Sequence, residues 1–308
     1  DRQIHVGRPD VKGREEILKV HAKGKKLDGD VSLKTLARAT SGFTGADLSN
    51  LMNEAAIMAA RDNRPVLNMK DLNDAMMKIV AGPEKRSRVR LQKDLRLTAI
   101  HEAGHAVAMH NLPGHDPVHQ ISIIPRGDAL GLTWSSPKED STHLTRNEMY
   151  ENIVTLLGGR IAEQIVLDDI STGASSDLER ATKTARAMVT RYGFSEKLGP
   201  VVYGEADENV FLGRDLGQHK NYSEAIASQI DMEIRSVVDS AYTRCTNILQ
   251  EHLDLLTDVA EYLIQYEKIN GEDFEKIMEG KKDEVYAATL AREFEISFGE
   301  IMPKIDAA

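Results

Sequence analysis

The sequence has 308 residues, enough for two domains that each bury a core. Its 39 Lys and Arg against 49 Asp and Glu give a net charge of −10, which argues against a nucleic-acid-binding surface, because such surfaces show a basic excess. Eleven Met, one Trp and an aromatic content of 5% favour an aliphatic, mainly helical interior. The single cysteine, Cys245, excludes an internal disulfide framework and is typical of a reducing compartment.

Membrane and export signals are expected to be absent from these residues. No apolar run approaches the length of about 18 residues that a spanning helix needs, and no cationic and apolar leader opens the chain. The chain begins at Asp1 without an initiator methionine, and its first residues, D-R-Q-I-H-V, already lie inside a sequence pattern. We therefore expect it to be a piece of a longer protein.

The first 80 residues are predicted to form a compact helical unit, because apolar residues recur there at helical spacing. The predicted helices are residues 11–21, 32–39, 46–61 and 69–80. Thr44 or Gly45 can cap the third of them. A stretch rich in Lys and Arg follows Gly82, so we expect a first domain at residues 1–82 and a linker at residues 83–93.

A second, again mainly helical domain is expected at residues 94–281. Its predicted helices are residues 94–111, 145–166, 176–192, 223–250, 253–265 and 271–278. Thr145 with Glu148, and Ser176 with Glu179, have the spacing of capping boxes that begin two of these helices.

A small β element and a tail complete the predicted fold. Residues 119–124 and 130–134 flank an R-G-D turn and predict a β-hairpin. Its second strand could pair with an extended substrate chain, or it could belong to an ordinary core hairpin. Residues 282–308 have no clear packing partner and are expected to form a C-terminal tail. The fold class is therefore mainly α, in two domains with a small β element.

The most informative string is H-E-A-G-H at residues 101–105, inside a predicted helix. Residues four apart lie on one face of a helix, so His101 and His105 can direct both imidazoles at one metal ion. Glu102 would lie beside that ion, where a carboxylate can take a proton from a water and pass it to a leaving amine. This is the H-E-x-x-H pattern of zinc hydrolases, which requires a helix as its context.

The alternative is a pair of ordinary core or surface histidines on an amphipathic helix. Gly104 argues against this alternative, because glycine destabilises a helix interior by about 1 kcal/mol and is better explained by a group that approaches the backbone closely. Two imidazoles on an otherwise apolar helix would also need partners if they were buried.

A catalytic zinc needs a third protein ligand and leaves one position open. The string after His105 lacks the third histidine of the metzincin pattern, so a carboxylate is expected. Glu163 lies on a predicted helix, as the acidic ligand of thermolysin-like enzymes does. Asp177 lies at the start of the next helix, where an acid is also favoured by the helix dipole alone. Spacing does not choose between the two.

Several motifs together resemble the FtsH family of membrane-anchored, ATP-dependent zinc metalloproteases. The likeness covers about residues 1–278. The motifs are S-G-F-T-G-A-D-L at residues 41–48, H-E-A-G-H-A at 101–106, H-D-P-V-H at 115–119, I-P-R-G at 124–127, S-T-G-A-S-S-D-L at 171–178, Y-G-F-S-E-K-L-G-P at 192–200 and V-F-L-G-R at 210–214.

For the peptidase, the resemblance implies that zinc is bound by His101, His105 and Asp177, with Glu102 as general base. Glu163 is then a nearby helix residue, an outer partner of a ligating histidine. For residues 1–82, it implies the C-terminal helical lid of an AAA+ ATPase domain. The positions that would contact a nucleotide are Ile17, His21, Gly45 and Ala46. The alternative is that His21 ends a helix and that Gly45 and Ala46 make an ordinary turn.

The resemblance also implies the setting of the whole protein: a homo-hexamer that uses ATP and Mg²⁺ to pass unfolded or membrane proteins to the peptidase. It would be anchored in the cell (inner) membrane through an N-terminal part absent here, with this portion in the cytoplasm. The sequence contains no G-x-x-x-x-G-K-[ST] phosphate loop, so we expect no ATP hydrolysis by this chain alone.

Two other functions compete with this interpretation. A chaperone or assembly ring subunit with an inactive peptidase site would be signalled by loss of Glu102 or of a histidine, and all three residues are present. A free-standing, secreted thermolysin-like peptidase is disfavoured by the missing leader and by the lid.

Overall fold

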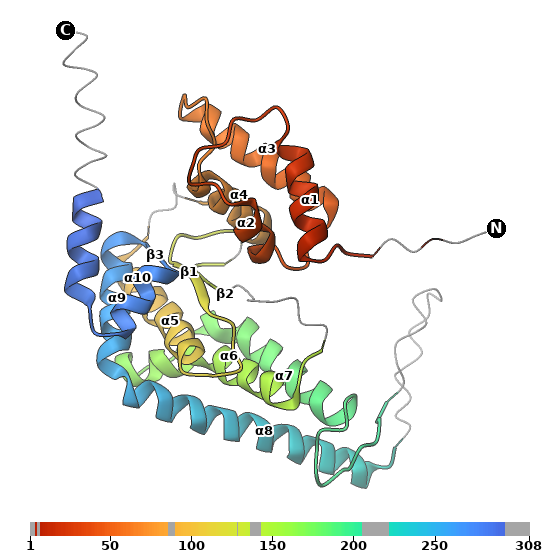
Figure 1. The fold of residues 1–308 in the computed structure, drawn as a ribbon. Helices are drawn as coiled ribbons and strands as arrows, with labels where there is room; N and C mark the ends of the chain where they lie inside the picture. Colours follow the sequence, from red (N-terminus) through yellow and green to blue (C-terminus); the bar gives the residue numbers. More distant parts are fainter. Residues whose placement is uncertain are drawn as a thin grey trace. The chain divides into compact units, whose positions relative to one another are not determined.

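The computed structural model describes residues 4, 7–85, 90–127, 129–135, 143–204 and 222–292 (Figure 1). The chain divides into two compact units. The first contains Asp1–Ala99, Asp116–Thr142 and Glu261–Ala308, and the second contains Ile100–His115 and His143–Ala260. Most described residues are helical, which confirms the mainly α class with a small β element.

Four helices open the first unit: α1 (Val11–Ala22), α2 (Leu33–Ala39), α3 (Gly45–Arg61) and α4 (Met69–Ala81). The predicted cap of α3 is confirmed, because the Thr44 side chain accepts from the N–H of Asp47 and the Asp47 carboxylate bonds back to Thr44. Asn68 and Asp71 form the same reciprocal cap at α4. The helices bury an aliphatic core that includes Leu18, Leu36, Leu48, Leu51, Met52, Leu72 and Met76.

A three-stranded antiparallel sheet also belongs to the first unit. Its strands are β1 (Val118–Ser122), β2 (Leu132–Ser135) and β3 (Lys268–Asn270), in the order β2-β1-β3. The predicted hairpin is confirmed by the pairing of β1 with β2, which is an edge strand. Strand β3 is missing from the sequence prediction. It has three residues and pairs with a strand about 150 positions earlier, so no local pattern marks it.

The second unit is helical. Helix α5 (Gln92–His110) begins in the first unit and enters the second at Ile100, and α9 (Leu253–Tyr266) returns to the first unit. Between them lie α6 (Arg146–Leu167), the short 3₁₀ helix η1 (Thr172–Ala174), α7 (Ser175–Thr190) and α8 (Glu224–Glu251). Helices α6, α7 and α8 pack against one another (Figure 1). Their shared core includes Ile153, Leu157, Ala181, Ala185, Val189, Ala241 and Cys245.

The two predicted capping boxes of this part have different outcomes. The box of Thr145 and Glu148 is confirmed at the start of α6. The box of Ser176 and Glu179 is wrong, since α7 begins one residue earlier and has no side-chain cap. The physical reason is that η1 leads directly into α7, and the cap lies before η1, where the Ser171 side chain accepts from the N–H of Gly173.

After α10 (Gly271–Met278), residues 282–292 form a further helix. The expectation that this segment has no packing partner is wrong for these residues. Val285 is fully buried, and the Tyr286 ring lies 5.3 Å from that of Tyr262. Arg292 donates to the Asp273 carboxylate at 3.1 and 3.2 Å.

Two remaining expectations concern the limits of the described chain. The V-F-L-G-R motif at residues 210–214 and the segment 293–308 lie outside the described residues. Within the residues that are described, no helix combines the length and apolarity that crossing a membrane requires.

Candidate metal centre

Helix α5 presents the two histidines of the H-E-x-x-H string on one face. Its opposite side is held by Ala103, Ala106 and Val107, which are fully buried, so the helix cannot rotate without exposing apolar surface. The His101 and His105 rings lie edge to face with centroids 4.7 Å apart. Their Nε2 atoms approach each other to 3.1 Å.

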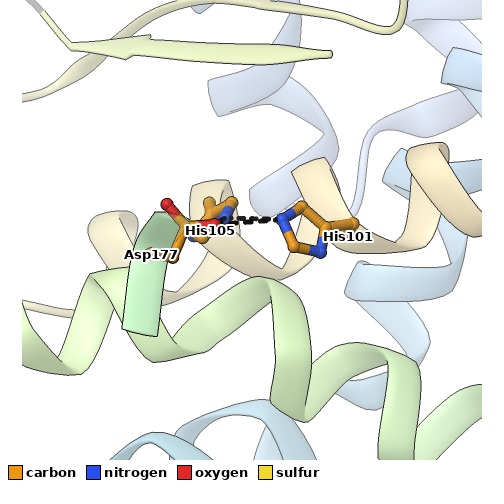
Figure 2. A group of neighbouring side chains, drawn as sticks. All are labelled: His101, His105 and Asp177. Carbon is orange, nitrogen blue, oxygen red and sulfur yellow. Dashed lines mark hydrogen bonds and ion pairs between the residues drawn. The ribbon is translucent and has the colours of Figure 1, made fainter. Parts of the chain in front are cut away.

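Asp177, in the first turn of α7, completes a cluster with the two histidines (Figure 2). Its Oδ2 lies 3.4 Å from Nε2 of His101 and 3.6 Å from Nε2 of His105. Figure 2 shows the three side chains pointing toward one another from α5 and α7. Among the described residues, these three form the group of His, Cys, Asp or Glu side chains close enough to share one ion.

The spacing of this donor set fits a tetrahedral metal. Zinc binds nitrogen and oxygen at about 2.0–2.1 Å, which places tetrahedral donor atoms about 3.3 Å apart. The three observed separations of 3.1, 3.4 and 3.6 Å bracket that value. Two neutral imidazoles and one carboxylate are also a ligand set that zinc accepts, with a fourth position left for water.

The remaining nitrogen of His105 fixes its tautomer. Nδ1 lies 2.8 Å from the backbone carbonyl oxygen of Thr155 on α6. A carbonyl oxygen only accepts hydrogen bonds, so Nδ1 carries a proton, and in the neutral ring that binds a metal Nε2 keeps its lone pair. The lone pair is therefore available in the direction of His101 and Asp177. Sequence reasoning missed Thr155, because a backbone carbonyl leaves no mark in the residue type.

Glu163 fixes the tautomer of His101 from a position outside the donor cluster. Its Oε1 accepts from Nδ1 of His101 at 2.7 Å, and its Oε2 accepts from the N–H of Ser171 at 2.7 Å. The Glu163 side chain is fully buried, in contrast to an ordinary exposed helix residue. Of the two carboxylates considered from the sequence, the structure thus places Asp177 against both Nε2 atoms and Glu163 behind one of them.

The electrostatics of the cluster favour a cation. Burial raises the pKa of Asp177, but hydrogen bonds with His101 and His105 outweigh burial and hold that pKa well below its usual range. Burial likewise raises the pKa of Glu163, and the hydrogen bonds of His101 and Ser171 lower it by more. For His101, burial lowers the pKa, yet the bonds to Asp177 and Glu163 raise it to about 10. Two ionised carboxylates therefore attract positive charge to this place, whether a proton or a metal ion.

Glu102 lies next to the cluster on α5. Its side chain is 7% exposed, and its charge raises the pKa of the neighbouring His101. A largely buried carboxylate at this place can accept a proton from a water at the fourth coordination position.

A close helix crossing holds the cluster in place. A Cβ built on Gly104 of α5 would lie 2.5 Å from both the carbonyl oxygen of Gly158 and the Cβ of Ala162 on α6. The reciprocal Cβ on Gly158 would lie 2.7 Å from the carbonyl oxygen of Gly104. The close approach that Gly104 predicts is therefore confirmed, and its partner is α6.

The four positions predicted to contact a nucleotide lie in the first unit. Ile17 and His21 are one turn apart on α1, and Gly45 and Ala46 begin α3. A Cβ built on Gly45 would lie 3.9 Å from Cδ1 of Ile17, which places these two positions in contact. His21 is not part of the metal-binding group found among the described residues.

Comparison with known proteins gives two family matches. Residues 88–277 match peptidase family M41, and residues 30–74 match the AAA+ lid domain. Three curated relatives named ATP-dependent zinc metalloprotease FtsH illustrate the similarity. The protein of Thermoanaerobacter sp., FtsH 1, is 56% identical over 91% of this chain and 46% of its own length. The protein of Caldicellulosiruptor bescii is 54% identical over 90% of this chain and 45% of its own length. The protein of Myxococcus xanthus is 48% identical over 91% of this chain and 44% of its own length.

The chain spans about half the length of these curated relatives. The peptidase match covers more than half of the chain and includes every residue of the metal cluster. The chain therefore belongs to peptidase family M41, with an AAA+ lid domain ahead of a zinc metalloendopeptidase domain.

Proposed function

We propose that this chain cleaves peptide bonds at a zinc ion held by His101, His105 and Asp177, with Glu102 as general base. The observation that carries the proposal is the convergence of two Nε2 atoms and one carboxylate oxygen, each histidine having its Nδ1 fixed by α6. Donor atoms oriented in this way need no rearrangement to accept an ion.

The chain's own residues supply the remaining chemistry. When bound, zinc acidifies a coordinated water and polarises the scissile carbonyl. Glu102 accepts the proton of the attacking water and donates it to the departing amine, so that one carboxylate serves both steps. Glu163 and the Thr155 carbonyl keep both imidazoles in the orientation that ligation requires.

The function of the whole protein extends this proposal. We infer that the chain is part of a membrane-anchored, ATP-dependent protease that assembles as a homo-hexamer and degrades unfolded or membrane proteins, with this portion in the cytoplasm. The names of the relatives and the match to the AAA+ lid support ATP dependence, and with it ATP and Mg²⁺ as cofactors. Both histidines and Glu102 are present, which favours an active peptidase over an inactive assembly subunit.

The peptidase is tested by metal analysis of the purified chain together with cleavage of casein, a loosely structured substrate. We expect near-stoichiometric zinc, cleavage that stops with a chelator, and recovery on adding zinc. Glu102→Gln should keep the metal and lose cleavage, because an amide cannot accept the proton. A Glu102→Gln chain that still cleaves casein at the wild-type rate would overturn the assignment of the base.

The expectation that this chain alone does not hydrolyse ATP has its own test. Because the sequence holds no phosphate loop, the pure chain should hydrolyse no ATP and bind nucleotide weakly. Release of inorganic phosphate from ATP measures hydrolysis, and steady ATP turnover by the pure chain would contradict this prediction.

A further inference from the structure

One stripe of α6 faces both histidines of the metal centre. Thr155, Gly159 and Glu163 are spaced four residues apart, so they lie along one face of the helix. Thr155 accepts from His105 through its carbonyl, and Glu163 accepts from His101 through its carboxylate. Gly159 lies between these two contacts, and neither the metal ligation nor the proton transfer uses it.

The space at Gly159 is filled by the imidazole of His101. A Cβ built on Gly159 would lie 2.5 Å from Nε2 and 2.6 Å from Nδ1 of that ring, with Cε1 nearer still. The three nearest atoms are thus all ring atoms of one metal ligand. Real Cβ atoms do not approach other atoms this closely, so any side chain at position 159 must displace the ring.

The neighbouring Gly158 has a different role. A Cβ there would meet the carbonyl oxygen of Gly104 at 2.7 Å and Cα of His105 at 3.2 Å, which are backbone atoms. Gly158 therefore serves the helix crossing, whereas Gly159 borders the ligand. Separating α5 and α6 to make room for a side chain at position 159 would open the close crossing at Gly104 and Gly158 and lose its packing contacts.

We propose that Gly159 is a positioning residue of the metal centre. Its missing side chain forms the slot in which the His101 ring keeps Nδ1 at Glu163 and Nε2 toward Asp177. The inference rests on the proposed zinc site and adds a requirement to it: α6 must offer empty space at the position one turn before its orienting carboxylate. The slot is specific to the ring, because backbone atoms are not among its nearest neighbours.

The consequence of Gly159→Ala follows from the way the ring is held. With both helices fixed, the ring must rotate, and it then loses the bond to Glu163 and the approach of Nε2 to Asp177 together. Losing an outer partner alone typically costs about 10–100-fold in metal affinity. Because Gly159→Ala displaces the ligand as well, we expect the dissociation constant for zinc to rise by about 100-fold or more.

The test compares Gly159→Ala with Gly158→Ala in the whole 308-residue chain. Zinc affinity is measured by competition with a graded chelator, and cobalt substitution reports ligand geometry through its absorption spectrum. The melting temperature of the metal-free protein is measured in parallel. Gly159→Ala should weaken zinc binding, change the cobalt spectrum and lower the melting temperature of the metal-free protein, because the displaced ring loses its bond to Glu163 with or without zinc. Gly158→Ala should lower the metal-free melting temperature whether or not the His101 ring is present, because its Cβ meets backbone atoms.

A second comparison removes the ring itself. In a His101→Ala background, adding Gly159→Ala should raise the melting temperature of the metal-free protein, because the atoms that opposed a Cβ are gone. Gly159→Ala with wild-type zinc affinity would overturn the proposal. So would equal destabilisation by Gly159→Ala with and without the His101 ring, since that would make Gly159 a packing residue. A wild-type chain that takes up no zinc would instead overturn the metal centre, and the role of Gly159 with it.

Discussion

The candidate metal centre and the four positions predicted to contact a nucleotide differ in how their residues are arranged. At the metal centre, the donor atoms of three residues converge within 4.8 Å of one another, and both histidines are bonded to α6 through their other nitrogen. In the lid, Ile17 lies against Gly45, and His21 is not part of the metal-binding group found among the described residues. A metal site is defined by directional atoms that one chain can supply, whereas a surface that packs against a nucleotide needs only shape. The donor atoms of the proposed metal site are therefore all supplied by this chain, while a phosphate-binding loop is not in its sequence.

The largest effect that separates the two regions is loss of the metal. His101→Ala or His105→Ala removes one of three protein ligands and leaves an incomplete site, so each should abolish zinc retention. His21→Ala in the lid removes a histidine that belongs to no such cluster, and its zinc content should equal that of the wild type. Zinc per chain after dialysis measures both. Full zinc occupancy in His101→Ala would show that the cluster is not the metal site.

A finer comparison separates the two carboxylates at the centre. Asp177 contacts both Nε2 atoms, so Asp177→Asn should weaken zinc binding by orders of magnitude. Glu163 orients His101 from behind, so Glu163→Gln should weaken binding by only about 10–100-fold. Titration of both variants with a graded chelator measures the difference. If Glu163→Gln were the more damaging change and Asp177→Asn nearly silent, Glu163 would be the third ligand.

The same two regions show which features a sequence reveals. The cap of α3 at Thr44 and that of α6 at Thr145 could be predicted, because the donor and acceptor lie within four residues of each other. The pairing of His101 with His105 is also local, since it depends only on the helical period. Strand β3 is not local, and neither is the carbonyl of Thr155, which bonds to a residue 50 positions earlier.

The third ligand is a feature that local spacing narrows to two residues but does not decide. Spacing leaves Glu163 and Asp177 equivalent, because their distances to the histidines depend on how α6 and α7 pack. The structure separates them through the crossing at Gly104 and Gly158, which brings Glu163 to Nδ1 of His101 rather than to Nε2. Tertiary packing, which no local pattern encodes, thus decides which carboxylate lies against both Nε2 atoms.

A third comparison concerns stability and uses one glycine from each region. Gly104→Ala places a Cβ against backbone and Ala162 at 2.5 Å, and overpacking of this kind costs about 1–3 kcal/mol or more. With two contacts at 2.5 Å the cost lies near the upper value of about 3 kcal/mol, and the helix preference of alanine returns about 1 kcal/mol, so we expect a net loss of about 2 kcal/mol. Gly45→Ala meets only Cδ1 of Ile17, at an ordinary 3.9 Å, and should change stability by less than about 0.5 kcal/mol. Chemical denaturation of the metal-free variants measures both, and equal losses would contradict the difference.

The smallest expected effect is a pH-dependent change in the stability of the lid. Asp71 is buried, and it accepts from Arg64 and from the N–H of Asn68. Burial raises the pKa of Asp71, but these bonds outweigh burial and lower it below its usual range. In the unfolded chain that pKa is about 3.9, so the stabilisation is complete above about pH 5 and is lost as the pH falls through the lower, folded value.

The matched variants are Asp71→Asn and Asp62→Asn, because Asp62 binds the same arginine from an exposed position. Asp71→Asn should cost about 1 kcal/mol at pH 7, less than a fully buried charged hydrogen bond because Arg64 is partly exposed. The difference from the wild type should stay constant down to about pH 5 and shrink below about pH 4. Asp62→Asn should have almost no effect at either pH, since exposed ion pairs contribute little.

Denaturation curves between pH 3 and pH 7 measure these differences. A gap between wild type and Asp71→Asn that widens on acidification would reverse the sign and show that Asp71 is protonated in the folded lid.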